Sequence, residues 1–231
     1  MNERVVSRDE WVSERQKLLV KEKEMTRLRD QLNEQRLALP WVKVDKKYVF
    51  EEGDGLVALA DLFGKRSQLA VYHFMFAPEW EAGCPGCSFL CDHVDSARQH
   101  FEHNDLSFVA VSRAAWPKLE AYRKRMSWTF RWVSSDESDF NYDFGASYKR
   151  ADLDAGPVFH NFKVQKLNFE DQPGVSVFYK DEAGDIFHTY SLYERGGEHF
   201  IAAYDWLDIA PKGRNEDEVM DWMQRHDEYK D

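Results

Sequence analysis

The chain has 231 residues, of which 43% are hydrophobic and 15% aromatic, so it can bury a substantial core and is not a disordered protein. Its formal net charge of -11 argues against nucleic acid and anionic membrane surfaces as partners, since both select clustered Lys and Arg. The sequence has no apolar run near the ~20 residues that span a bilayer, and its polar first nine residues lack the apolar core of a signal peptide, so we expect a cytoplasmic protein.

Residues 7–37 are predicted to form one long helix. Ser7 and Glu10 fit a capping box at its start, and Pro40 ends it. One apolar residue recurs every seven positions, at Trp11, Leu18, Met25 and Leu32. The second seam that a coiled coil requires is mostly polar or charged, so the stripe predicts a helical arm, residues 1–39. Packing on its own domain and packing on a partner subunit both fit this stripe, and we predict the second, a homodimer through the arm.

The segment after the arm leads into a buried strand. Residues 41–50 alternate loosely between apolar and polar and predict a strand or hairpin, and residues 56–63 predict a short helix closed by Gly64. Residues 69–76 form a continuous apolar run, which is typical of a strand that is buried on both faces.

The most informative motif of the chain is Cys84-Pro85-Gly86-Cys87, which a short loop joins to this strand. The residues that follow trace one apolar helical face at Leu90, Cys91, Val94, Ala97 and Phe101. A CxxC at the start of a helix, directly after a buried strand, indicates dithiol chemistry. The unpaired N–H groups of a helix N-terminus favour a thiolate over a thiol, and the thiolate is the form that attacks disulfides and peroxides.

The rest of the chain alternates strands and helices. We predict a buried strand at 106–111, a helix at 116–126, a short strand at 130–134, a hairpin at 175–193 and a last helix through Val219, Trp222 and Met223, capped by Asn215. Strand, helix, strand and helix in this order, followed by a hairpin and terminal helices, predict an α/β domain with a partly parallel sheet.

Several separate motifs carry a resemblance to a known family. They are Gly83-Cys84-Pro85-Gly86-Cys87, Pro173-Gly174-Val175-Ser176-Val177-Phe178, His188-Thr189-Tyr190-Ser191 with Arg195-Gly196, and Leu207-Asp208 with Pro211-Lys212-Gly213-Arg214. Together they resemble a bacterial thioredoxin-like family of unknown function, described as predicted dithiol–disulfide oxidoreductases, within the thioredoxin and peroxiredoxin superfamily. The resemblance implies a thioredoxin-like α/β fold over residues 40–210, with a central mixed β-sheet flanked by helices. The N-terminal helical arm precedes it, and a C-terminal helical extension, residues 211–231, follows.

The two cysteines of the motif are the predicted catalytic residues. Cys84, near the helix cap, is the expected nucleophile, and Cys87, one turn further, is the expected resolving thiol of a thiol–disulfide oxidoreductase. A weak thiol peroxidase is one alternative, although Glu81 stands where peroxidatic sites have Thr or Ser, and a nearby carboxylate opposes a lowered thiol pKa. A non-catalytic metal- or ligand-binding module is another, with Cys91 as a third thiolate and His93 or His73 as a fourth ligand.

We also predict five substrate-binding residues. By the resemblance, Pro173 carries a cis bond that faces the CxxC, and a plain trans Pro-Gly turn is the alternative. Gln172 and Trp80 are expected beside it. His188 and Tyr190 share one strand face by their spacing of two and line a substrate pocket or pack in the sheet. We assign no cofactor and no metal, and the expected partners are a thiol or disulfide substrate and a reductant protein.

Overall fold

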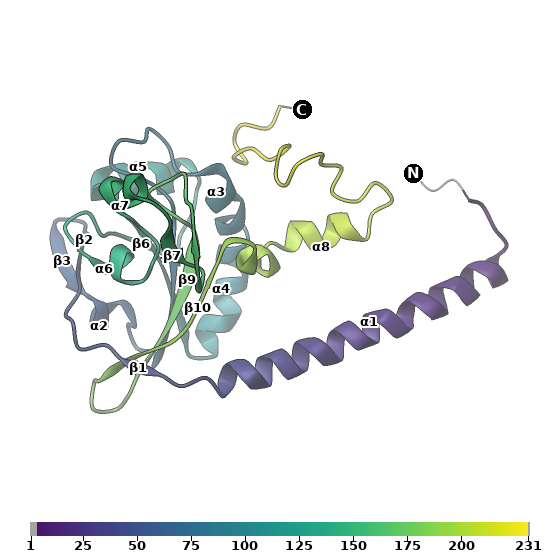
Figure 1. Ribbon diagram of the computed structural model, residues 1–231, viewed down its shortest axis with the longest axis horizontal. Coiled ribbons are helices and arrows are strands. Elements are labelled where there is room, and N and C mark those ends of the chain that lie inside the picture. Colours follow the sequence, from purple (N-terminus) through teal and green to yellow (C-terminus); the bar gives the residue numbers. More distant parts are fainter. Residues whose placement is uncertain (1–3, 231) are drawn as a thin grey trace.

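The protein, described over residues 4–230 by a computed structural model, is built on an eight-stranded mixed sheet (Figure 1). In sheet order the strands are β1 (Val42–Lys43), β10 (Ile186–Tyr193), β9 (Gly174–Lys180), β4 (Gln68–His73), β5 (Leu106–Ser112), β6 (Arg131–Ser134), β2 (Val49–Glu52) and β3 (Gly55–Ala58). Strands β4, β5 and β6 are parallel, and β9 and β10 join them as an antiparallel hairpin. A separate hairpin consists of β7 (Val158–His160) and β8 (Lys163–Gln165).

Helices cover both faces of the sheet. The helices of the described residues are α1 (Arg8–Leu37), α2 (Leu59–Leu62), α3 (Pro85–Cys91), α4 (Val94–His103), α5 (Trp116–Arg125), α6 (Phe140–Asp143), α7 (Arg150–Ala155), the 3-10 helix η1 (Glu194–Phe200) and α8 (Ala202–Asp208), of which α1 covers neither face. Side chains of α3, α4, α5 and α8 pack into the core on one face, and those of α2 and α6 into the core on the other. This arrangement confirms the predicted thioredoxin-like α/β fold.

The two central strands, β4 and β5, lie between two hydrophobic cores, and alternate residues of each strand face one core and then the other. In β4, Leu69 and Val71 join the core beneath α2 and α6, whereas Tyr72 joins the core beneath α3 and α4. Strand β5 alternates in the same way, with Val109 on one side and Ala110 on the other. Because both faces are covered, the strands are continuous apolar runs, which is why the sequence shows them clearly.

Three predicted elements are divided in the structure. The short helix predicted at 56–63 is the end of β3 followed by α2. The strand or hairpin predicted at 41–50 is two strands: β1 lies at one edge of the sheet, and β2 lies next to the strand at the other edge. The single helix predicted after the CxxC is two helices, because a turn at Asp92 and His93 separates α3 from α4. The apolar spacing continues across the turn, so periodicity alone did not reveal the break.

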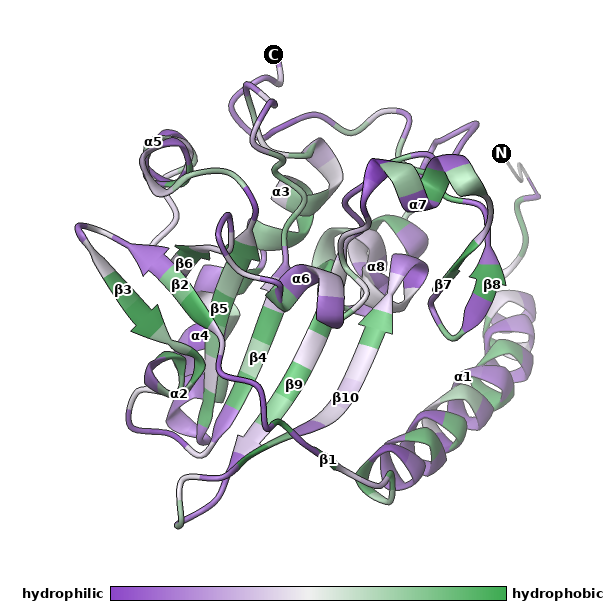
Figure 2. Ribbon diagram, turned by 60° about the vertical axis from the view of Figure 1, so that its left-hand side comes forward, coloured by the Kyte–Doolittle hydropathy of each residue, from purple (hydrophilic) through white to green (hydrophobic). Residues whose placement is uncertain are grey.

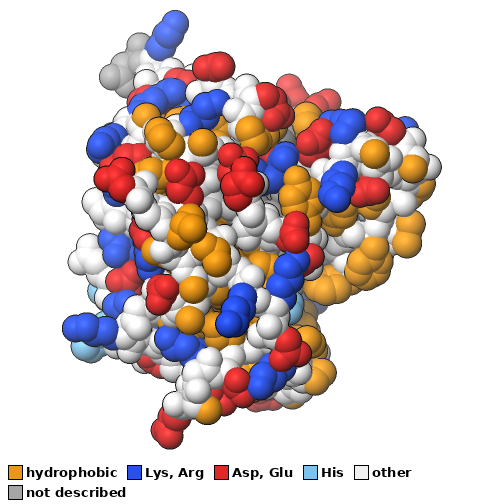
Figure 3. All heavy atoms as spheres, turned by 90° about the vertical axis from the view of Figure 1, so that its left-hand side faces the viewer, with side chains coloured by type: hydrophobic (Ala, Val, Ile, Leu, Met, Phe, Trp, Pro, Cys, Tyr) orange, Lys and Arg blue, Asp and Glu red, His pale blue; other side chains and the backbone are white. Residues whose placement is uncertain are grey.

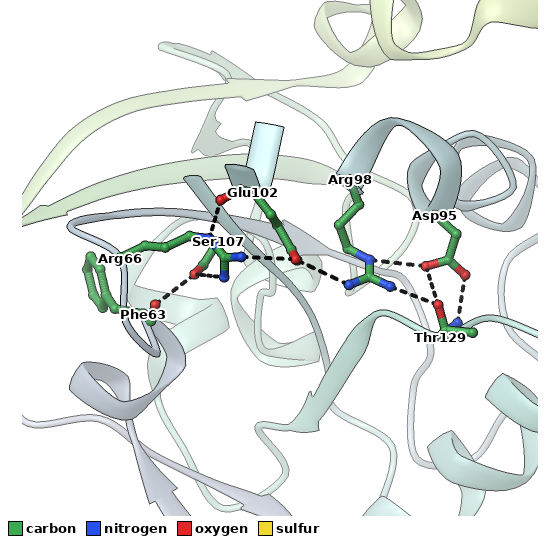
Figure 4. Close-up of polar contacts among 7 residues, drawn as sticks. All are labelled: Phe63, Arg66, Asp95, Arg98, Glu102, Ser107 and Thr129. Carbon is green, nitrogen blue, oxygen red and sulfur yellow. Dashed lines mark hydrogen bonds and ion pairs between the residues drawn. The ribbon is translucent and has the colours of Figure 1, made fainter. Parts of the chain in front are cut away.

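A polar network fastens α4 to the loops beside it (Figure 4). The guanidinium of Arg98 bonds Asp95 at 3.2 Å, Glu102 at 3.2 Å and the hydroxyl of Thr129 at 2.8 Å. Arg66, which follows α2, donates to the backbone oxygen of Glu102 at 2.5 Å. These bonds tie α4 to the loops that precede β4 and β6. Because α4 packs on the same core as α3, they also help to fix the helix that contains Cys87 and Cys91.

The predicted arm is a helix that projects from the edge of the sheet (Figure 1). It begins at Arg8, and the Ser7 hydroxyl accepts a hydrogen bond from the backbone N–H of Glu10 at 3.2 Å, as the sequence predicted. No residue of α1 is buried, and its apolar stripe is exposed, with Trp11 at 48% and Met25 at 70%. Where the chain is described, no helix combines the length and the apolar character needed to cross a membrane.

The C-terminal segment differs from the prediction. Residues 211–230 contain turns and no helix, although the sequence predicts one after Asn215. Side-chain carboxylates there accept backbone N–H groups: Asp221 caps Asp217 and Glu218, and Glu216 caps Met220. Such local bonds compete with helix formation. Residues 1–3 of the predicted arm and residue 231 of the predicted extension lie outside the described residues.

Candidate functional site

Cys84 occupies the N-cap of α3, where the chain turns from the β4 loop into the helix. Its own N–H donates to the backbone oxygen of Met75 at 3.0 Å, and its backbone oxygen accepts the first helical bond from Ser88 at 2.9 Å. Pro85 follows at the first helical position, where its missing N–H costs nothing. Cys84 is therefore held on two sides by backbone bonds, and its side chain stands beside the free N–H groups of the first turn.

Gly83 allows this loop to lie directly on the aromatic core. A Cβ at this position would lie 2.6 Å from a ring carbon of Phe74 and 2.9 Å from one of Tyr122. Both rings are buried, so neither has space to withdraw. This close approach explains why glycine stands directly before the first cysteine.

Gly83→Ala is expected to lower the free energy of unfolding by about 1–3 kcal/mol, the usual cost of overpacking a filled core. The displaced loop should also change the reactivity of Cys84. Gly55→Ala is the matched control, because nothing lies within 4 Å of its added Cβ. Urea unfolding of the two variants measures the difference, and equal stability would contradict the close packing described above.

The two thiols of the motif lie in different environments. Cys84 is partly exposed, whereas Cys87 is 1% exposed. A hydrogen bond from Cys87, with help from the backbone N–H groups of Cys87 and Gly86, lowers the pKa of Cys84 to about 6, although burial opposes the shift. Burial, and then the neighbouring Cys84, raise the pKa of Cys87. Glu81 is exposed and does not prevent the low pKa of Cys84, contrary to the sequence-based argument.

Arg225 lies at the site, and the sequence analysis did not predict it there. It reaches the site from the C-terminal segment and donates two hydrogen bonds to the backbone oxygen of Gly83, at 2.7 and 3.1 Å. Its positive charge also favours the Cys84 thiolate and contributes to the lowered pKa. Arg225 and Cys84 are 141 positions apart in the sequence, so no local sequence pattern could predict their contact.

The third cysteine and the two histidines of the metal alternative have other partners. Cys91 is fully buried in the core beneath α3, and burial raises its pKa. The ring nitrogens of His73 lie 3.0 Å from Asn141 and 2.9 Å from Ser176, and burial lowers its pKa to about 4. His93 bonds the backbone at Phe89 and Ala203. Within residues 4–230, no group of three or more His, Cys, Asp or Glu is arranged to hold a metal ion.

A pocket of about 290 Å³ opens beside the two thiols. Cys84, Cys87 and Pro173 line it, together with residues of η1 and of the C-terminal segment. Pro173 therefore lies beside the CxxC as predicted, but its peptide bond is trans, since the described residues contain no cis bond. The predicted cis bond is wrong, and the ordinary Pro-Gly turn is the observed conformation. Gly174 is required at the turn because a Cβ would meet Tyr193 at 2.6 Å.

The other four predicted substrate-binding residues do not line this pocket. Gln172 donates to the backbone oxygen of Phe169 at 2.9 Å, and Trp80 packs against the core beneath α3. His188 and Tyr190 do not share a face, because a β-bulge lies between them. His188 lines a separate cavity with Phe144, and Tyr190 packs on the opposite face of the sheet. A bulge inverts the alternation on which the prediction depended.

Charged side chains of both signs are interspersed over the face of the molecule shown in Figure 3. Among the ion pairs of the described residues are those of Lys46 with Asp139 and Asp143 at 2.8 and 2.6 Å. On this face Lys and Arg are not gathered into the basic patch that a nucleic acid requires.

Several solved structures are similar to this chain. Among solved structures, peroxiredoxin Q of Xanthomonas campestris is 11% identical with a TM-score of 0.47 and covers 69% of this chain and 89% of its own. The peroxidoxin BcpB of Mycobacterium tuberculosis is 13% identical with a TM-score of 0.46, covering 71% and 94%. A candidate thiol:disulfide interchange protein DsbE from Chlorobium tepidum is 13% identical with a TM-score of 0.41, covering 71% and 97%.

At these identities and TM-scores the likenesses decide nothing about activity, and no curated protein matches the chain. One family model does match, over residues 1–229, and so covers the arm, the sheet and nearly all of the C-terminal segment. The chain therefore belongs to the family described as bacterial protein of unknown function (DUF899).

Proposed function

We propose that this protein is a thiol–disulfide oxidoreductase that uses Cys84 and Cys87. The observation that carries the proposal is their placement: Cys84 is partly exposed at the cap of α3 and in a pocket, and Cys87 lies buried behind it in the first turn. An accessible thiol with a low pKa suits attack, and a protected neighbouring thiol suits resolution. The proposal places the protein in the cytoplasm, where thiol systems keep such pairs reduced.

The proposed reaction has two steps. The Cys84 thiolate attacks one sulfur of a disulfide, the substrate S–S bond breaks, and the leaving thiolate takes up a proton. Cys87 then loses its proton and attacks the mixed disulfide at Cys84, which releases the second substrate thiol. The protein ends as the Cys84–Cys87 disulfide, two electrons have passed to the substrate, and an external dithiol restores the starting state.

The pH dependence of Cys84 alkylation tests the role of Cys84 as the activated nucleophile. Because its pKa is lowered to about 6, the thiolate is lost below that pH and is complete well above it. The rate with iodoacetamide should therefore rise about tenfold per pH unit below the midpoint and level off above it. Mass spectrometry identifies the labelled residue. A midpoint near the ordinary thiol value of 9.0 would contradict the proposal.

The peroxidase alternative predicts a different first product. Peroxide attack on Cys84 would leave a sulfenic acid there before any disulfide forms. A disulfide substrate would instead leave a mixed disulfide that carries half of the substrate. Mass analysis of the Cys87→Ser variant separates the two, because that variant cannot resolve either adduct.

We also propose that α1 mediates a homodimer. The helix is 30 residues long, or about 45 Å at 1.5 Å per residue, and its stripe has no cover within the described chain. Its eight Lys or Arg and seven Asp or Glu make it nearly neutral, whereas the whole chain carries -11. A second copy can therefore dock on the arm without bringing two acidic bodies into close contact.

Deleting residues 1–38 is expected to shift the protein from dimer to monomer in sedimentation, because the exposed stripe would be gone. Alkylation of Cys84 is the control and should be unchanged, since α1 does not line the cysteine pocket. A truncated chain with the same assembly state as the full chain would show that the arm is not the interface.

A further inference from the structure

The C-terminal segment lies over the cysteine site. We call residues 215–229 the lid. Val219 and Met220 form one wall of the pocket that contains Cys84. The sulfur of Met220 and the terminal methyl of Met223 lie 3.5 and 3.7 Å from where a Cβ on Gly86 would stand. The lid thus contacts the CxxC itself, and Figure 2 shows the segment passing across the end of α3.

Besides the bonds from Arg225 to Gly83, three groups of side-chain contacts anchor the lid to α3 and α5. The ring of Trp222 meets Phe89 edge to face, with centroids 5.6 Å apart. Arg125 at the end of α5 bonds both oxygens of Asp227, at 2.7 and 3.0 Å, and bonds Glu228 at 2.8 Å. His226 lies 2.7 Å from Asp92, directly after α3. The anchors span the two helices on either side of the cysteine loop.

The lid is supported by local hydrogen bonds and not by a helix or a sheet. It contains turns and no regular helix or strand, and Asn215 and Met220 adopt positive φ angles of 52° and 67°. The ion pairs that hold its end are partly exposed, with Arg125 at 38% and Asp227 at 33%. A segment held by a few side-chain contacts opens at a smaller free-energy cost than the sheet beneath it.

We propose that the lid selects low-molecular-weight disulfides and excludes macromolecular ones until it opens; this inference rests on the proposed function. A pocket of about 290 Å³ is at the lower end of the range for small-molecule sites. A folded protein substrate must bring its backbone close to Cys84 and the start of α3, and Met220, Met223 and Arg225 occupy that surface. With the lid closed, only a small disulfide reaches the sulfur, and the two-step exchange then proceeds as above.

Alkylation of Cys84 by reagents of two sizes tests access directly. The probes are iodoacetamide and the same group on a long polyethylene glycol chain, used at pH 9.0, the ordinary thiol pKa, so that thiolate content changes by at most about twofold if the lid opens. The reference is an exposed cysteine introduced by Asp154→Cys on α7. The large-to-small rate ratio is expected to be at least about tenfold lower at Cys84 than at the reference.

Two variants loosen the lid without substituting a residue that lines the cysteine pocket. Asp227→Asn with Glu228→Gln removes the partners of Arg125, and Trp222→Ser removes the ring on Phe89. Each should raise the large-to-small ratio at Cys84 about tenfold, with little change in the rate for the small reagent. The matched control is Asp152→Asn with Asp154→Asn, which makes the same charge change on exposed residues of α7 and should leave the ratio unchanged.

The same variants separate the lid from the proposed chemistry. Wild-type protein should reduce 2-hydroxyethyl disulfide faster than insulin, and the lid variants should gain mainly on insulin. A Cys84 ratio equal to that of the reference cysteine, or an unchanged ratio in both lid variants, overturns the lid. If the protein shows the predicted rate ratios but reduces neither disulfide, the lid is supported and the proposed oxidoreductase function is wrong.

Discussion

Cys84→Ser is expected to reduce the rate of disulfide reduction by at least about a thousandfold, because a serine hydroxyl does not ionise in the range where the thiol does. Cys87→Ser is expected to stop after the first step and to accumulate a mixed disulfide on Cys84. Reduction of 2-hydroxyethyl disulfide with dithiothreitol as reductant gives the rate, and intact-mass analysis after mixing the reduced variant with the disulfide alone detects the adduct.

The control for these variants is Cys91→Ala. Cys91 is fully buried and does not line the pocket with the other two cysteines, so its removal should leave the rate within a small factor of wild type once folding is confirmed. If Cys91→Ala lost activity to the same degree as Cys84→Ser, or if Cys87→Ser turned over normally, the assigned roles would be wrong.

The second large effect is expected at Arg113, which pairs with Asp171. The Nε of Arg113 lies 2.6 Å from an Asp171 oxygen, and the two side chains are only 11% and 5% exposed. Ser147 donates to the same Asp171 oxygen at 2.7 Å, and the other oxygen is buried without a partner. Asp171 stands two residues before Pro173, so this pair holds the turn that forms one wall of the cysteine pocket.

Arg113→Leu should lower the free energy of unfolding by about 3–5 kcal/mol, since it leaves the Asp171 carboxylate buried and uncompensated. Arg113→Leu combined with Asp171→Leu should recover much of the loss, because the uncompensated charge is then gone. Lys43→Met is the exposed control: its pair with Asp185 lies at the surface and should matter little. Urea denaturation measures the stability of all three variants. If Arg113→Leu were as stable as Lys43→Met, the buried pair would not have the importance given to it here.

The elements that the sequence predicted well are those determined by local features, such as a continuous apolar run or a helix cap. Strands β4 and β5 have cores on both faces, so their continuous apolar runs predicted them. Ser7 marked the start of α1 because its hydroxyl makes a local bond to Glu10. The CxxC indicated both thiols and their unequal exposure, because helix position alone places Cys84 at the cap and Cys87 one turn inside.

The parts that the sequence did not predict depend on contacts between distant residues or on irregular backbone. Arg225 and the lid reach Cys84 only because the chain returns across α3, and the anchor at Arg125 is a tertiary contact. His188 and Tyr190 were assigned to one face by their spacing, and the bulge between them reverses it. In the lid, Glu216 and Asp221 bond to backbone N–H groups, which favours turns over the helix that Val219 and Trp222 suggested.

Peptide mapping of the mildly oxidised protein tests the central claim most directly. The protein should form one intramolecular disulfide between Cys84 and Cys87, because the two thiols are neighbours in the first turn of α3 and Cys91 is buried apart from them. The bond should open again with dithiothreitol, and Cys91 should stay free throughout. A disulfide that contains Cys91, or a Cys84 that is oxidised to sulfinic acid without ever pairing with Cys87, would contradict the account.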